Sequence, residues 1–163
     1  MRTQAKSNRI ILQERFLKDL GNSVANHTET NLWPLIVSIN DPIPMTYALY
    51  IYDTSHPTGG RPLKEFKINL YVPGQKRYEY SEFDFSEGLP LMVSYVEDYD
   101  VYIIYDHTKH KRFKWCNNVQ SHLELILDAC LNNMAFETKK NGEVQIAVTS
   151  KYLLKGIIKR LSI

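Results

Sequence analysis

Residues 101–116 read VYIIYDHTKHKRFKWC, a basic turn between two stretches that are typical of strands. Residues 101–105 form a β-branched and aromatic run, and residues 113–116 are expected to be its hairpin partner. A rigid hairpin that carries so much positive charge is suited to contact phosphate groups, although a solvated turn is the more common meaning of a short charge cluster. The charged and imidazole side chains of this turn are His107, Lys109, His110, Lys111, Arg112 and Lys114.

Similar runs occur on both sides of this stretch. Residues 65–72 alternate between apolar and polar side chains, as expected of a strand with one buried face. Asn141-Gly142 predicts a type I′ hairpin turn between strands at 134–138 and 144–148. Further strands, bounded by Pro, Gly, Asn or Asp, are expected at residues 35–39, 47–52 and 91–96.

Helical spacing of apolar residues predicts a helix over residues 9–20, ended by Gly21. A second helix is expected over 119–131, with Asn118 as its cap and with Leu123, Ile126, Leu127 and Cys130 in its apolar stripe. A third is expected over 151–161, opened by Ser150 and weakened by Gly156. Residues 22–33 are polar and are expected to be a turn region.

Seven or eight short strands with flanking helices, and no regular strand–helix alternation, indicate a mostly β, α+β fold. We expect an antiparallel, open, barrel-like architecture. At 163 residues the chain, 1–163, is expected to form one domain.

The formal net charge is only +2, so a nucleic-acid partner has to be argued from where the charges lie. The 11 tyrosines suit half-buried strands and also interfaces. Cys116 and Cys130 have no spacing typical of disulfide frameworks or metal cages, and we expect buried free thiols. No secretory signal and no membrane span is visible, which predicts a cytoplasmic protein that does not bind membranes.

The loop over residues 53–62 carries Gly59-Gly60-Arg61-Pro62. Adjacent glycines allow close backbone approach, and the prolines stiffen the flanks, so Arg61 is a candidate reader of guanine in the major groove. The alternative to base reading is a mobile surface loop in which Arg61 is only solvated. Asn117 follows the basic turn, and its amide is suited to adenine or to phosphate.

A competing interpretation is a PD-(D/E)xK nuclease. Glu65 and Lys67 leave the same face of one strand, and Asp53 stands upstream as the missing carboxylate. Such a site holds a divalent metal and uses its lysine to position the attacking water. The strand–helix framework of that nuclease class is absent. His107, His110 and Cys116 lack further ligands at a spacing suited to zinc.

Several short motifs follow one another in an order that resembles modules of bacterial restriction–modification proteins. They are Gly60-Arg61-Pro62, Glu65-Phe66-Lys67-Ile68-Asn69, Asp106, His110 and Asn118-Val119-Gln120. The chain most resembles, over residues 45 to 130, the N-terminal DNA-recognition region of LlaJI-type, McrBC-related restriction subunits. The resemblance implies a B-three-like pseudobarrel, related to the plant transcription-factor domain. Two arms of such a fold clasp a duplex, and residues 54–64 and 106–114 would form them.

Intact subunits of that type also carry a nucleotide-hydrolysing motor, which has no counterpart in this sequence. We therefore predict a recognition domain without catalysis or cofactor, which binds double-stranded DNA for the further subunits of a restriction complex in phage defence. A protein-interaction module that uses exposed tyrosines is a second alternative to this function. The predicted DNA-contacting residues are Arg61, Lys64, Lys67, His107, Lys109, His110, Lys111, Arg112, Lys114 and Asn117.

Overall fold

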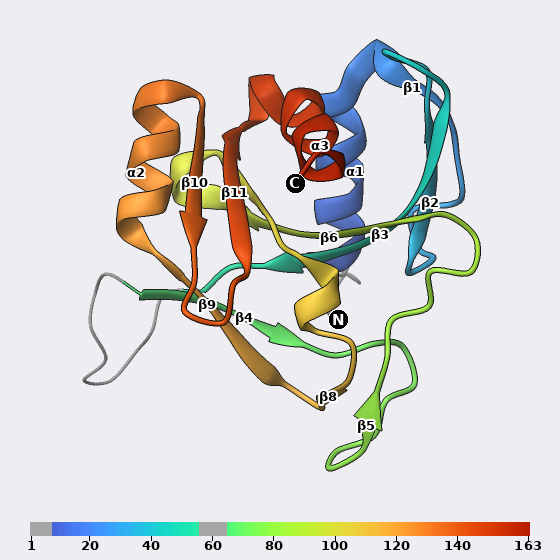
Figure 1. The fold of residues 1–163 in the computed structure, drawn as a ribbon. Helices are drawn as coiled ribbons and strands as arrows, with labels where there is room; N and C mark the ends of the chain where they lie inside the picture. The colour runs from blue at the N-terminus through green and yellow to red at the C-terminus, as the bar shows by residue number, and fades with distance from the viewer. Residues whose placement is uncertain (1–7, 56–64) are drawn as a thin grey trace, which may run out of the picture.

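A seven-stranded mixed sheet forms the centre of the computed structural model, which describes residues 8–55 and 65–163 (Figure 1). All neighbouring strands are antiparallel except β3 and β6, which are parallel. The sheet is open, with β1 and β10 at its edges. Its strands, in spatial order, are β1 Val24–His27, β2 Leu35–Ile39, β3 Met45–Asp53, β6 Leu89–Val96, β7 Val101–Ile104, β11 Val144–Thr149 and β10 Met134–Thr138.

Two antiparallel strand pairs lie outside this sheet. β4, Glu65–Leu70, pairs with β9, Asn117–His122, and β5, Tyr80–Ser81, pairs with β8, Phe113–Lys114. A single bridge between Ser55 and Lys67 ties β4 to the chain just after β3. The α+β class is therefore confirmed, but the described residues form an open mixed sheet with two added pairs and no closed barrel.

The described residues include three α-helices, which cover both faces of the sheet. α1, Asn8–Leu20, and α3, Leu153–Leu161, pack on one face, and α2, Leu123–Asn132, packs on the other. Because both faces are covered, β6 and β7 are buried almost continuously, and alternate residues enter two separate cores. No helix within the described residues is long and apolar enough to span a bilayer. The connecting 3-10 turns are η1 Gly21–Ser23, η2 Glu97–Tyr99, η3 His107–Lys109 and η4 Ser150–Tyr152.

Several predicted elements are confirmed. α1 differs from the expected helix only at its first residue, and Gly21 after it has the expected positive φ of 58°. The hairpin between 134–138 and 144–148 also forms, with the predicted pairing. Its turn is not type I′, because Gly142 has a positive φ whereas Asn141 does not. The Asn141 side chain instead accepts a hydrogen bond from the Glu143 N–H at 3.0 Å.

The predicted hairpin between residues 101–105 and 113–116 is wrong. β7 is already flanked by β6 and β11, so it has no free edge for another strand. Asp106 caps η3 by accepting a hydrogen bond from the Thr108 N–H at 3.0 Å, and the chain turns away from the sheet. Phe113 is then buried against Phe83, with 4.8 Å between ring centroids, and β8 pairs with β5.

The helix predicted over 119–131 begins later, at Leu123, because its first residues form β9. Pairing with β4 satisfies the backbone of 117–122, so Asn118 is a strand residue and caps no helix. The helix also presents a different face to the core. Leu125, Ile126 and Ala129 are buried, whereas Cys130 lies on the exposed side of α2 and is not the buried thiol expected. Both cysteines are free, and Cys116 is half-buried.

Gly156 does more than weaken its helix. A Cβ atom at this position would lie 2.9 Å from Val148 Cγ1 and 3.2 Å from Ile104 Cδ1. The missing side chain therefore lets α3 approach the sheet closely. Ser150 opens η4, and its hydroxyl donates to Asp100 at 2.6 Å and makes no helix cap.

Asp100 joins three parts of the fold. Its carboxylate accepts hydrogen bonds from the Tyr95 hydroxyl at 2.7 Å and from Ser150, and Arg15 of α1 approaches it at 3.4 Å. Burial alone raises the pKa of Asp100, but the hydrogen bonds from Ser150 and Tyr95 and the charge of Arg15 outweigh it. The net effect holds the pKa below its ordinary value of 3.8.

Asp100 is therefore expected to make the stability of the protein depend on pH. A lowered folded-state pKa contributes stability above the unfolded pKa of 3.8 and loses it as the pH falls through the folded value. We expect Asp100→Asn to be less stable than wild type in urea at neutral pH, and the difference to shrink at strongly acidic pH. Asn suits the left-handed φ of 52° here, so the backbone is not strained. A difference that is constant with pH would contradict this role.

Candidate nucleic-acid interface

The outer face of the β4–β9 pair is a ladder of polar side chains. On the inner face, Phe66, Ile68, Leu70 and Val119 are buried in the core. Strand alternation then directs every second residue outward, and the antiparallel register sets these residues opposite one another. The outward cross-strand pairs, which we call the polar ladder, are Glu65–His122, Lys67–Gln120 and Asn69–Asn118.

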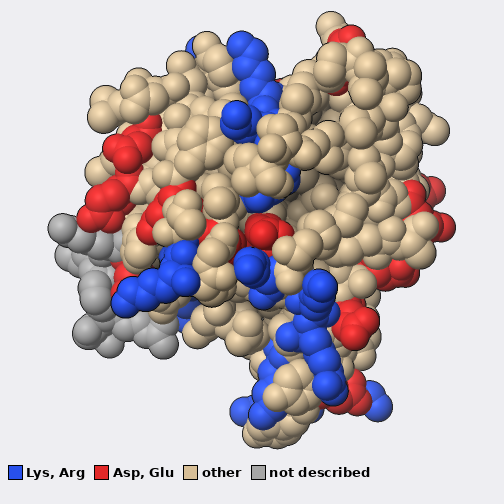
Figure 2. Space-filling model, viewed as in Figure 1, with Lys and Arg blue, Asp and Glu red and all other residues tan. Residues whose placement is uncertain are grey.

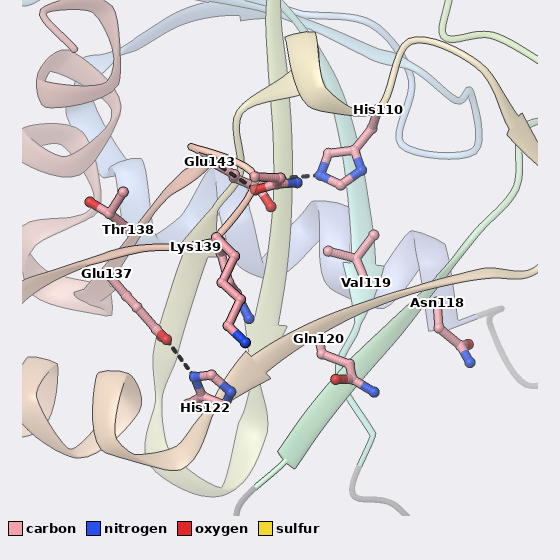
Figure 3. Close-up of a pocket in the computed structure, with 11 residues that line it drawn as sticks. His110, Asn118, Val119, Gln120, His122, Glu137, Thr138, Lys139 and Glu143 are labelled. Carbon is pink, nitrogen blue, oxygen red and sulfur yellow. Dashed lines mark hydrogen bonds and ion pairs between the residues drawn. The ribbon is translucent and has the colours of Figure 1, made fainter.

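A hollow of about 640 Å³ lies between β9 and the end of the β10–β11 hairpin (Figure 3). Asn118 and Gln120 of the polar ladder line one side, and Lys139 and Lys140 of the hairpin line the other. Figure 3 shows a hydrogen-bonded pair at each end, His110 with Glu143 and His122 with Glu137. Amide groups therefore face ammonium groups across an open hollow.

Glu143 of the β10–β11 hairpin holds the basic turn in place. Its side chain is only 3% exposed, and its Oε2 lies 2.7 Å from His110 Nε2. The same oxygen accepts a hydrogen bond from the Asp106 N–H at 3.3 Å. The Lys109 ammonium lies over the nearby turn, where a Cβ on Gly142 would be 3.5 Å from it. The turn after β7 is thus fixed to β11 by a buried carboxylate.

Gln145, the second residue of β11, holds β9 in the same way. It is fully buried, donates to the Gln120 carbonyl at 2.9 Å and accepts from the Ser121 hydroxyl at 2.8 Å. Glu143 directly precedes the same strand. The start of β11 therefore positions both the basic turn and the polar ladder.

β5, β8 and the turns beside them form an arm, residues 73–81 and 111–116, at the end of the molecule away from α2 and α3 (Figure 1). Gln75 braces it by donating to the carbonyl groups of Glu79, at 2.9 Å, and Phe113, at 3.2 Å. Tyr80 is 54% exposed, and the Arg112 guanidinium lies 4.5 Å from its ring centroid. Lys114 lies on the same ring at 5.7 Å. The cation–π contacts hold Arg112 and Lys114 beside the exposed Tyr80 ring on the surface of the arm.

Positive charge is concentrated on the face that carries these features. Figure 2 shows Lys and Arg atoms gathered over the arm and continuing across the middle of the molecule, where Asp and Glu atoms lie among them. A surface with this distribution attracts a polyanion even though the whole chain carries only +2.

The structure locates most of the predicted contact residues. Arg61 and Lys64 lie outside the described residues. Lys109, Lys111, Arg112, Lys114 and Asn117 are exposed, and Lys67 lies half-exposed in the polar ladder.

The two histidines of the basic turn are less available. His110 is occupied by Glu143, and its side chain is 10% exposed. His107 stacks edge-on against Phe85 with 5.3 Å between centroids. Burial, with smaller contributions from Arg160 and Lys111, lowers the pKa of His107 despite the opposing charge of Asp106.

Part of this surface was not predicted from the sequence. Lys139 and Lys140 were not among the predicted contact residues, although a basic pair beside an Asn-Gly turn indicates an exposed, positively charged loop. Gln120 and His122 were assigned to a helix, which hid their shared outward face with Lys67.

Two of the three nuclease candidates have other charged neighbours in the structure. Asp53 lies near Glu97, and burial followed by that charge raises the pKa of Asp53. Glu65 stands opposite His122 on β9. Within residues 8–55 and 65–163, no group of three or more His, Cys, Asp or Glu side chains is placed to hold a metal ion.

Comparison with known proteins gives one match. A family model described as Methylase-associated X1 (MTaX1) matches residues 45–157, more than half of the chain. The matched region runs from β3 into α3 and includes the polar ladder, the arm and the β10–β11 hairpin. No curated protein matches the chain, and no solved structure does.

Proposed function

Since the chain belongs to the Methylase-associated X1 family, we propose that it recognises double-stranded DNA for a restriction–modification system. The family description links this domain to methylases, and a methylase in such a system needs its target sequence located. The observation that carries the DNA-binding part is the polar ladder with cations on both flanks. Lys139 and Lys140 lie on one flank, and Arg112 and Lys114 belong to the arm on the other.

The chemistry of the ladder suits base edges. A two-stranded β-ribbon fits the major groove, where Gln and Asn pair with adenine and Lys with guanine. Lys67, Gln120 and Asn118 project from such a ribbon at neighbouring positions. The lysines and arginines at its sides would contact phosphates, which supply affinity and set the register.

The finer fold prediction belongs to this proposal. The β4–β9 pair is fastened to β11 through Gln145, so it curves back under the open sheet. We regard this arrangement as the open pseudobarrel of the B-three-like, LlaJI-type recognition domains that the sequence resembles. In this proposal the domain has no catalysis of its own and works with further subunits of a restriction complex.

The proposal predicts binding to duplex DNA that weakens steeply with salt. Fluorescence anisotropy with a duplex of random sequence should give a linear fall of log affinity with log salt. Replacing both Lys139 and Lys140 by alanine should reduce the magnitude of that slope by about 1.8, since each lost phosphate contact is worth about 0.9. Lys18→Ala is the matched control, because Lys18 is an exposed residue of α1, and it should leave the slope unchanged.

Base recognition has a different signature. Gln120→Ala should leave the salt slope unchanged and reduce the preference for a selected duplex by about 1–3 kcal/mol. Incubation of the same protein with plasmid and magnesium tests the nuclease alternative, which requires cleavage. No salt-dependent binding to any duplex would end the proposal.

A further inference from the structure

Helix α2 has apolar residues on both of its sides. Leu125, Ile126 and Ala129 face the core and are fully or almost fully buried. Leu127 is 42% exposed and Leu131 is 81% exposed. A helix that only covers a sheet needs one apolar stripe, and the outer leucines lie outside that stripe.

The exposed leucines share one side of the helix with two acids. Glu124, Leu127, Asp128 and Leu131 follow the spacing i, i+3, i+4 and i+7, which brings them to one face. We call this the outer face of α2. It carries alternating apolar and carboxylate groups along its length.

A hollow of about 340 Å³ lies between this face and the edge strand β10. Glu124, Leu125 and Asp128 line it from the helix, and Phe136 and Glu137 line it from β10. His122 of the polar ladder also lines it, beside its ion-pair partner Glu137. Phe136 is 48% exposed, and β10 has no strand on its outer side among the described residues. The outer face of α2 therefore continues into a recess that has an aromatic residue and a free strand edge.

The charge of this surface determines what can bind there. Figure 2 shows Asp and Glu atoms along the α2 side of the molecule. The carboxylates of Glu124 and Asp128 repel phosphate, so the outer face of α2 does not suit DNA. Glu137 is paired with His122, and the Lys159 ammonium lies 5.8 Å from the centroid of the Phe136 ring. Exposed leucines beside acidic side chains suit a protein surface with an apolar centre and a Lys or Arg rim.

We propose that the outer face of α2 and the β10 recess dock a protein partner of that chemistry, the methylase subunit of the same restriction–modification system. The inference rests on the proposed function, because the family description supplies the methylase. It gives the molecule two adjoining surfaces, a basic one for DNA and an acidic, apolar one for the enzyme that DNA recognition serves. The two surfaces meet at His122 and Glu137, which line both hollows.

The test uses the full chain and the purified DNA methyltransferase of the same system, titrated against each other by isothermal calorimetry. Leu131→Glu should weaken binding at least tenfold, because it buries a carboxylate in an apolar contact that already has an acidic rim. Glu124→Lys combined with Asp128→Lys should weaken it by reversing the rim charge. Ile43→Glu is the matched control, since Ile43 is 59% exposed in a loop away from α2, and should bind like wild type.

Each outcome decides the inference. It is overturned if wild type does not bind the methyltransferase, or if Leu131→Glu binds as tightly as Ile43→Glu. It is also overturned if wild type forms a dimer that Leu131→Glu dissociates, because the face would then bind a second copy of the chain. Duplex affinity of Leu131→Glu should stay close to that of wild type, whereas the double lysine variant should bind duplex more tightly because it gains positive charge. Loss of duplex binding in wild type would refute the DNA proposal and leave a positive calorimetric result standing.

Discussion

Gly88→Ala is expected to lower the free energy of unfolding by about 3 kcal/mol, at the upper end of the usual range for overpacking. A Cβ at Gly88 would lie 2.6 Å from the Ala48 nitrogen and 2.6 Å from the Tyr47 carbonyl carbon. These are backbone atoms of β3 beside the parallel pairing of β3 with β6, where Tyr47 stands opposite Leu89. Relief of the contact requires the two central strands to separate at this end.

Urea denaturation followed by tryptophan fluorescence measures this effect. Gly74→Ala is the comparison, because Gly74 has a φ of 78° but nothing within 4 Å of an added Cβ. It should lose only about 1 kcal/mol through backbone strain. Equal losses for the two variants would show that the strand contact at Gly88 is unimportant.

Glu143→Leu is expected to destabilise the protein by about 3 kcal/mol and to weaken duplex binding as well. The substitution removes the acceptor for His110 and for the Asp106 N–H, and both lie in the turn that carries the cations. The imidazole of His110 then remains in a site that is 10% exposed, without its partner. Freed from β11, the basic turn has to be ordered again when DNA binds.

Two measurements separate these effects. Tryptic cleavage within residues 109–114 should accelerate more than global unfolding accounts for, because the turn is released locally. The double variant Glu143→Leu with His110→Leu should recover part of the stability, since no polar group is then left unpaired. If Glu143→Leu leaves cleavage of the turn unchanged, Glu143 does not anchor it.

Local signals were enough to predict the elements whose partners are close in sequence. The helix at α1 and the hairpin of β10 and β11 follow from apolar spacing and from the Asn-Gly turn. Prediction was wrong where a distant strand decided the structure. Residues 117–122 have no strong strand pattern, and they become β9 because β4, some fifty residues earlier, offers a free edge. The short β5 was missed for the same reason, because its partner β8 lies far along the chain. The short β1 was missed because residues 22–33 are polar, although its partner β2 is the next strand in the sequence.

The candidate interface was only partly predictable. The cations of the basic turn are exposed as expected, but the support is the buried Glu143 and not a hairpin. The local sequence does not show that the Glu143 side chain is buried, because its burial depends on which distant strands cover it. The first predicted arm, residues 54–64, lies largely outside the described part of the chain, so Arg61 remains a prediction.

Strand alternation has an evolutionary consequence for the β4–β9 pair. The residues that bury the pair in the core point inward, and Lys67, Gln120 and Asn118 of the ladder point outward. Mutations at Lys67, Gln120 or Asn118 can therefore accumulate at little thermodynamic cost. Under the proposed function, substitutions in the ladder could therefore change the recognised DNA sequence while the scaffold stays the same.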